Sequence, residues 1–358
     1  MADASTQPGA PAPSAGAPGA PVDAGGSRNV RALVFLRDRG IIILWLVLVA
    51  FFAVWAQPYF FTLTNAALVA NAAALAGIFA AAVAFGILSG ALDLSIPGTS
   101  AVAGVVAGLA LAADKPVWLA ILAAMLTGAA VGYVNGWLVQ RGLNALVVTI
   151  AMLTALGGVA NLLSDGVAIT GLTQLTWLGN GDLWGVPSMV IAVGLLFLVS
   201  IFWLNQFRSG SRLQAVGSNI EAVRRVGLLA DRYRILGFVL SGICGALGGI
   251  AVLATTSQAS PAPSVDLLFA AITAVALSGM PLTGGRGSLA KVLVGTLIIA
   301  TINSALIIKG IQPYWTTVIT GLLLVGALAF DKVMTSAVTA RLTASAVVPD
   351  GTDESKQA

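Results

Sequence analysis

Long apolar stretches separated by short polar turns fill most of the chain. About ten of them approach the roughly 20 residues that a helix needs to cross the hydrocarbon core of a bilayer. They cover residues 41–57, 65–88, 97–113, 116–139, 145–163, 187–205, 235–257, 266–281, 289–308 and 314–330. Backbone polar groups in lipid must be hydrogen-bonded within the protein, and no alternating barrel pattern is present, so these stretches predict helices. The expected fold class is an all-α integral membrane protein with about ten transmembrane helices.

The apolar stretch 65–113 is interrupted near its single charged residue, Asp93. Glycine and proline around this point disfavour a continuous helix, and we expect a broken or re-entrant helix here. The break has a weak echo later in the chain at one constant offset: Leu88-Ser89-Gly90 with Gly98-Thr99, and Leu277-Ser278-Gly279 with Gly287-Ser288. Transporters often contain such repeats, but two glycine-rich apolar stretches also match by chance.

The composition requires a lipid environment. Hydrophobic residues make up 58% of the chain and charged residues 9%, whereas soluble domains are about one quarter charged. The 41 glycines fit helices that approach one another closely in a membrane. With no histidine and one cysteine, Cys244, the chain excludes histidine or cysteine-cluster metal sites and histidine-based catalytic pairs. We expect no metal, no cofactor and no enzymatic activity.

Basic residues predict the orientation, because cytoplasmic loops of membrane proteins carry the excess of lysine and arginine. With the N-terminus inside, all 18 basic residues except Lys115 and Lys309 fall on the cytoplasmic side. Both termini are then cytoplasmic. We expect residues 1–39 to form a disordered N-terminal tail, residues 40–332 the transmembrane domain, and residues 333–358 a cytoplasmic C-terminal tail.

Residues 205–234 form the longest cytoplasmic loop in this topology. Ser218 or Asn219 can cap a short helix there, with Glu221 in its first turn, where a negative charge is favoured. A short capped helix on the cytoplasmic face suits the docking of a soluble partner. The alternative is an ordinary basic loop that binds anionic lipid.

Three motifs in order resemble one family, over roughly residues 40–332. The long loop resembles the Gly-x-Asn-x-x-Ala-Ala-Arg-x-x-Gly segment of permease subunits of ribose-type sugar ABC importers, carbohydrate uptake transporter family two, with Val223 replacing the second alanine. Residues 88–95 resemble the family's Ser-Gly-Gly-Ile-Asp-Leu-Ser. Residues 271–288 resemble its glycine-rich segment ending in Gly-Gly-x-Gly-Ser, with Ser278-Gly279-Met280 in place of the usual glycine pair. Asp331, which closes the last apolar stretch, also matches.

The resemblance implies a permease subunit of an ATP-driven importer in the bacterial inner membrane, forming the pathway for a monosaccharide or related small polar solute. Its implied partners are ATPase subunits, a periplasmic or lipid-anchored sugar-binding protein, a second permease copy, identical or not, and membrane lipid, with no nucleic acid. The chain lacks a Gly-x-x-x-x-Gly-Lys-Ser/Thr loop, so ATP hydrolysis is expected on a separate subunit. The residues expected in the ATPase-coupling loop are Gly217, Asn219, Glu221, Ala222, Arg224, Arg225 and Gly227.

Polar residues at apparent membrane depth are candidates for the translocation pathway or gate: Asn71, Ser89, Asp93, Asn135 and Asn303. A charge such as that of Asp93 costs about 2.5–3.5 kcal/mol at the bilayer centre, which favours a functional role. The alternative is a hydrated or helix-capping residue in a cytoplasmic turn. For the asparagines, contact with sugar hydroxyls competes with interhelical hydrogen bonding. The scarcity of buried charge suits a neutral polyol better than an ion.

Two other functions stay open. One is a branched-chain amino-acid, urea or nucleoside permease of the same superfamily, of which the branched-chain permeases usually lack the Asp-Leu-Ser element. The other is an ion-coupled secondary transporter, which needs titratable groups in the membrane and finds only Asp93 here.

Overall fold

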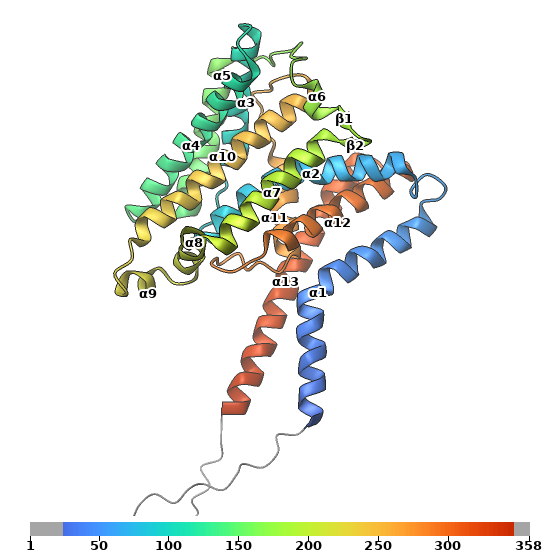
Figure 1. The fold of residues 1–358 in the computed structure, drawn as a ribbon, viewed down its shortest axis with the longest axis vertical. Coiled ribbons are helices and arrows are strands. Elements are labelled where there is room, and N and C mark those ends of the chain that lie inside the picture. Colours follow the sequence, from blue (N-terminus) through green and yellow to red (C-terminus); the bar gives the residue numbers. More distant parts are fainter. Residues whose placement is uncertain (1–23, 347–358) are drawn as a thin grey trace, which may run out of the picture. The chain divides into compact units, whose positions relative to one another are not determined.

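The computed structural model describes residues 24–346, with side chains described for residues 39–312, 314–329 and 332. The chain divides into two units, residues 1–40 and 41–358. Helix α1 (Ala24–Trp55) begins in the first unit and continues into the second. The second unit holds all the other helices and both strands of the described chain (Figure 1).

The second unit is almost entirely helical. Its helices after α1 are α2 (Leu63–Leu88), α3 (Ile96–Ala112), α4 (Val117–Gln140), α5 (Ala145–Leu163), α6 (Thr176–Gly179), α7 (Ser188–Gln206), α8 (Arg208–Ser218), α9 (Ile220–Arg225), α10 (Ala230–Thr256), α11 (Val265–Leu277), α12 (Leu289–Ile308) and α13 (Pro313–Ala346). A small antiparallel hairpin, β1 (Asp182–Leu183) and β2 (Val186–Pro187), precedes α7. Its turn residues Trp184 and Gly185 have φ values of 55° and 79°, the left-handed conformation of tight hairpin turns.

Each of the ten apolar stretches overlaps a helix, which confirms the helical fold class. Six helices, α2, α4, α5, α7, α10 and α12, are long and apolar enough to cross a membrane. Four more apolar segments are shorter: Arg39–Trp55 of α1, α3, α11 and Tyr314–Ala329 of α13. The chain is therefore a multi-pass membrane protein, and the count of ten crossings stays a prediction.

Helix α10 packs against α4, α3 and α2 (Figure 1). The contact with α4 is made by glycines. A methyl group on Gly128 would lie 2.2 Å from the carbonyl oxygen of Gly242, and one on Gly132 would lie 2.2 Å from that of Phe238. Without side chains at these positions the two backbones come into direct contact, as expected for membrane helices with small residues at their interface.

Helical structure extends into both of the regions that the sequence predicts as tails. Helix α1 begins at Ala24, inside the predicted tail of residues 1–39. Helix α13 ends at Ala346, well beyond residue 332. The stretches 28–39 and 333–346 contain no proline or glycine, so both are able to continue a helix. Residues 1–23 and 347–358 of the predicted tails lie outside the described residues.

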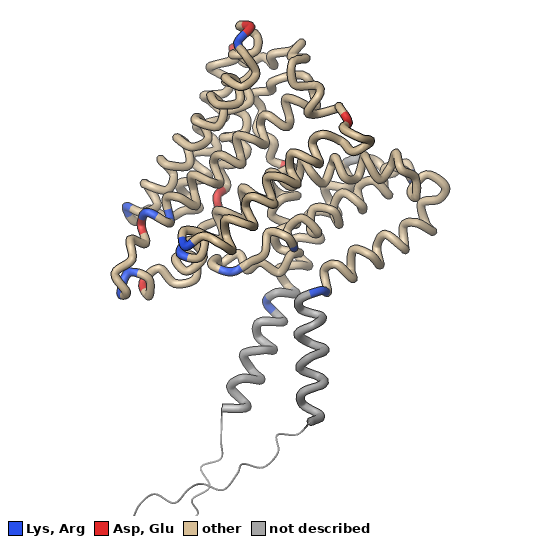
Figure 2. The backbone as a smooth tube through the Cα atoms, in the orientation of Figure 1, with Lys and Arg blue, Asp and Glu red and all other residues tan. Residues whose placement is uncertain are grey.

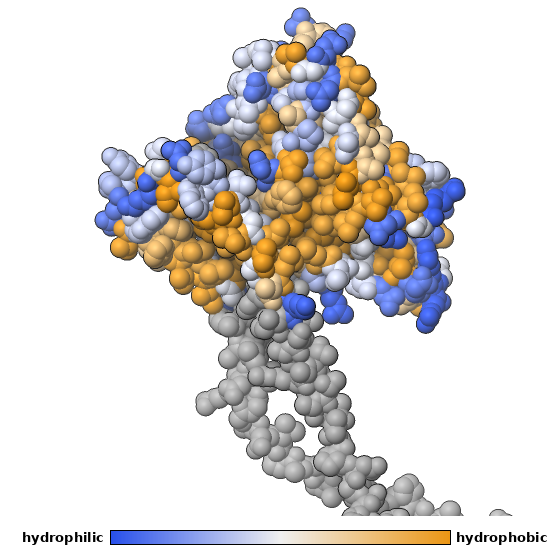
Figure 3. Space-filling model, turned by 180° about the vertical axis from the view of Figure 1, so that it is seen from behind, coloured by the Kyte–Doolittle hydropathy of each residue, from blue (hydrophilic) through white to orange (hydrophobic). Residues whose placement is uncertain are grey.

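The surface of the second unit matches a lipid-embedded protein. Figure 3 shows hydrophobic residues covering the middle of one face, with hydrophilic residues gathered toward its margins. In Figure 2, most Lys and Arg residues of the unit gather at the end that holds α8, α9 and the start of α10. The apolar band fits lipid tails, and the basic end marks one membrane surface.

Candidate coupling and pathway site

The predicted break after α2 is present, and it is built by a Leu-Ser-Gly sequence. The Ser89 hydroxyl donates to the carbonyl oxygen of Gly86 at 2.8 Å, and Gly90 follows with φ of 91°. Helix α11 ends in the same way: the Ser278 hydroxyl donates to Val275 at 2.6 Å, and Gly279 has φ of 75°. The sequence echo is therefore a repeated helix ending, since a residue in the left-handed conformation commonly ends a helix. Re-entry of the broken segment into the membrane stays a prediction.

Asp93 lies in the link between α2 and α3 and is 1% exposed. One carboxylate oxygen accepts hydrogen bonds from the backbone N–H and the hydroxyl of Ser95, at 2.9 and 2.6 Å. The other accepts from the Ser241 hydroxyl of α10 at 2.9 Å. The amide of Asn135 in α4 donates to the Ser95 hydroxyl at 2.7 Å. Of the alternatives for Asp93, a hydrated carboxylate is therefore wrong, because Asp93 is buried in a network that joins the link to α4 and α10.

Of the other pathway candidates, Asn135 joins the Asp93 network, whereas Asn71 and Asn303 do not. Asn71, nearer the other end of α2, donates to the carbonyl oxygen of Gly179 in α6 at 3.3 Å. Asn303 is half-buried in α12 and has no hydrogen-bond partner among the described residues. Ser95 and Ser241 were missed in the sequence. The Asp-x-Ser spacing was a usable signal for Ser95, because aspartate bonds the backbone two residues on in turns, whereas nothing in the local pattern marks Ser241.

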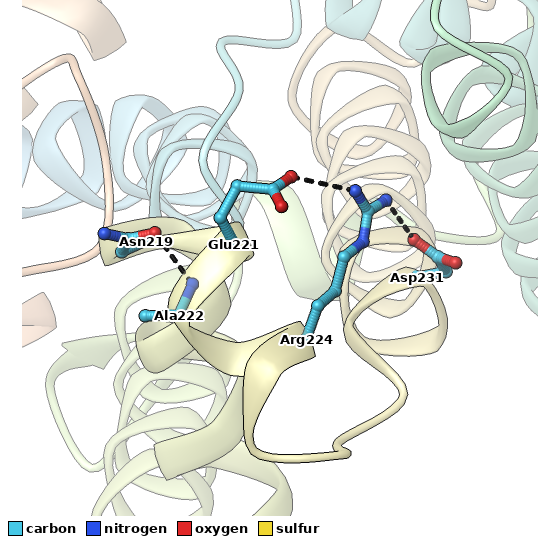
Figure 4. Close-up of polar contacts among 5 residues, drawn as sticks. All are labelled: Asn219, Glu221, Ala222, Arg224 and Asp231. Atoms are coloured by element: carbon cyan, nitrogen blue, oxygen red, sulfur yellow. Dashed lines mark hydrogen bonds and ion pairs between the residues drawn. The ribbon is translucent and has the colours of Figure 1, made fainter.

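The long cytoplasmic loop contains two helices. The short helix predicted after residue 218 is α9, and Asn219 is its cap: the side-chain oxygen accepts from the N–H of Ala222 at 3.0 Å (Figure 4). Ser218 is not the cap, because it is the last residue of α8. Helix α8 itself was missed among polar residues, and its signal was the pair Leu213 and Val216, three apart and both buried.

Arg224 connects α9 to α10. Its guanidinium donates to Glu221 at 3.0 Å and to Asp231, in the first turn of α10, at 2.8 Å (Figure 4). The hydrogen bond and charge of Asp231 raise the pKa of Arg224 above its usual value. Arg225, the other arginine predicted in the coupling loop, is exposed. Gly227 turns the chain between the two helices with φ of 76°.

Glycines bring the loop into contact with the end of α2. A methyl group on Gly217 would lie 2.1 Å from the carbonyl oxygen of Leu88. It would also lie 2.9 Å from the backbone nitrogens of Gly90 and Gly285. The Ser218 hydroxyl donates to the carbonyl oxygen of Gly285 at 3.1 Å. The three motifs, residues 88–95, 217–227 and 271–288, therefore meet at one place, which we call the three-motif junction.

Comparison with known proteins identifies the family of the chain. The family described as the permease component of branched-chain amino-acid transport systems matches residues 65–328. The chain belongs to this family. The permease is 30% identical to the ribose import permease of Escherichia coli (strain K12) over 304 residues, which cover 83% of this chain and 94% of the relative.

Two further relatives carry different sugars in their names. The permease is 33% identical over 295 residues to an L-arabinose ABC transporter permease of Azospirillum brasilense, covering 82% of this chain and 87% of the relative. It is 28% identical over 291 residues to the D-allose transport system permease of Escherichia coli (strain K12), covering 80% and 89%. No solved structure gives a significant match. The permease is thus a transport subunit of an importer that works with ATPase and substrate-binding partners.

Proposed function

We propose that the permease forms the pathway by which an ATP-driven importer carries a neutral monosaccharide into the cell. The observation that supports this most directly is the match of residues 65–328 to the permease family, together with relatives named for ribose, L-arabinose and D-allose. A second permease copy, an ATPase on the cytoplasmic side and a sugar-binding protein outside complete the proposed assembly.

Polar groups inside the unit favour a neutral solute over an amino acid. An amino acid carries a carboxylate and an ammonium, and both need counter-charges away from water. Among the described residues, Asp93 is the one buried charged side chain, and both of its oxygens already accept from serines. The side-chain oxygens of Asn71 and Asn135, in contrast, are buried without a partner. A sugar hydroxyl is a neutral donor that satisfies such an oxygen.

The end that holds α8 and α9 is proposed to face the cytoplasm and to dock the ATPase. Arg141 follows α4 at this end, since Gly136 of α4 lies against Ile235 near the start of α10. The long loop adds six arginines, and Arg286 and Lys291 follow at the start of α12. This concentration of basic residues fits the positive-inside rule. The capped helix α9, tied to α10 by Arg224, supplies a rigid docking element.

The test is reconstitution of the permease in lipid nanodiscs with its ATPase and binding protein. ATP hydrolysis should rise with one of ribose, L-arabinose or D-allose and stay basal with leucine, urea or adenosine. Stimulation by leucine but not by sugars would instead support the branched-chain amino-acid function. Uptake by this chain alone in liposomes, driven by a proton or sodium gradient, would refute an ATP-driven importer.

A further inference from the structure

Beside the three-motif junction lies an open cavity of about 300 Å³. The end of α2 lines it with Ser89 and Gly90, residues 216–220 line it from α8 and α9, and Arg234 of α10 completes it. We call it the α8–α10 cavity. Its walls come from the coupling loop and from the helix ends that the loop touches, so anything bound in it contacts both.

Arg234 is the charged group of this cavity, and it is half-buried. It makes no hydrogen bond or ion pair among the described residues, unlike Arg212, whose guanidinium donates to the Tyr233 hydroxyl at 2.8 Å. The two carboxylates of the loop, Glu221 and Asp231, are both bonded to Arg224. Asp231 attracts Arg234 only through space, and the charge of Arg224 opposes this attraction. A partly desolvated cation without an ion-pair partner is unfavourable, and none of the residues that line the cavity is acidic.

Among the other polar side chains of the cavity, the two serine hydroxyls already use their single hydrogens, so the Asn219 amide is the one neutral donor left on a described side chain. The Ser89 hydroxyl donates to Gly86, and the Ser218 hydroxyl donates within α8 or to Gly285. The Asn219 oxygen is taken by the N–H of Ala222, so its amide nitrogen remains without an acceptor among the described residues. A guanidinium and an amide N–H group together match a carboxylate, which accepts on two oxygens.

Resting on the proposed function, we propose that the α8–α10 cavity receives an Asp or Glu side chain of the ATPase subunit, which pairs with Arg234. The surrounding charge supports a protein partner with an acidic surface: residues 205–234 contain six arginines against Glu221 and Asp231. The glycine contacts around Gly217 and Gly90 keep the wall of the cavity rigid, because backbone atoms lie against backbone atoms. Since no flexible side chain separates these backbones, a movement of the bound carboxylate would be transmitted directly to the end of α2.

The test measures binding of the purified ATPase subunit to the full-length permease in nanodiscs of zwitterionic lipid. Wild-type binding first establishes the proposed function, independently of the cavity. Arg234→Gln should then weaken binding at least tenfold, because truncating one partner of a buried charge pair leaves the other unpaired. Arg234→Lys should retain part of the affinity. Arg232→Gln removes an exposed arginine that does not line the cavity, and it should bind as the wild type does.

Two results would overturn the proposal. One is equal affinity of the Arg234→Gln and Arg232→Gln permeases for the ATPase. The other is a loss of coupled activity in Arg234→Gln that appears only with anionic lipid while ATPase affinity is unchanged, which assigns the cavity to a lipid phosphate. Thermal unfolding of each variant separates a folding defect from lost pairing. Restored binding of Arg234→Glu by an Asp/Glu→Arg change in the ATPase would identify the partner carboxylate.

Discussion

Alanine at Gly217 tests the three-motif junction most sharply. Its methyl carbon would lie 2.1 Å from the carbonyl oxygen of Leu88, whereas such carbons essentially never approach another atom within 3.0 Å. The two backbones must therefore separate by roughly 1 Å. No side chain is able to rotate away, because the three nearest atoms all belong to backbone. Overpacking of this kind costs about 1–3 kcal/mol.

A cost of that size changes an equilibrium between two arrangements by about 5- to 150-fold. We expect the Gly217→Ala permease to insert normally, because the junction lies at a helix end rather than in a membrane span. Sugar-stimulated ATP hydrolysis, measured in nanodiscs against the basal rate, should fall at least fivefold. The melting temperature of the detergent-solubilised permease should fall as well.

Two other glycines provide the controls. Gly194 of α7 has no atom within 4 Å of an added methyl group, so Gly194→Ala should be neutral. Gly227 also has open space but a φ of 76°, which costs a residue such as alanine about 1–2 kcal/mol. Gly227→Ala should therefore lower activity through backbone strain, and Gly227→Asn should restore part of it. Wild-type stimulation and melting temperature in Gly217→Ala would refute the tight junction.

Three further predictions concern two polar contacts and the orientation of the chain. Asp93→Ala leaves buried hydroxyls without an acceptor and should lower the free energy of unfolding by about 1–3 kcal/mol, with a smaller effect for Asp93→Asn, which keeps an acceptor oxygen. Equal melting temperatures for both variants and the wild type would contradict this. Arg224→Ala should reduce sugar stimulation of the ATPase while copurification persists, because the substitution removes the ion pair that joins α9 to Asp231 of α10. Complete loss of copurification would instead show that Arg224 contacts the ATPase directly. Reporter fusions after residue 115 should lie outside and those after residues 141 and 220 inside, and an outside signal at 220 would reverse the orientation.

Apolar patterning located the membrane helices well, since burial in lipid depends on stretches of hydrophobic residues. It was less accurate at helix ends. The predicted stretch 235–257 starts later than α10, because the charges in the first two turns of that helix conceal its beginning. The predicted stretch 266–281 runs past α11, which Gly279 ends with its left-handed backbone. Charge and glycine geometry decide such ends, and neither changes the hydropathy of a window much.

The candidate site was predicted only in its local parts. The Asn219 cap and the placement of Glu221 depend on neighbouring residues, so the sequence revealed them. The bonds of Asp93 to Ser241 and of Arg224 to Asp231 depend on how helices pack, and no local pattern contains them. For the same reason the meeting of three motifs at one junction was not foreseen, although each motif was recognised separately.

The glycine contact between α4 and α10 also bears on how the protein is synthesised. Gly128 and Gly132 leave the ribosome about a hundred residues before Gly242, the residue against which α4 packs. Protein synthesis adds about 5–20 residues per second, so the glycine surface of α4, which we call the groove, has no α10 to pack against for roughly 5–20 s. During that time lipid, a neighbouring nascent helix or an insertion factor has to cover it. Bulky substitutions in the groove should therefore reduce the yield of correctly inserted protein before they affect transport.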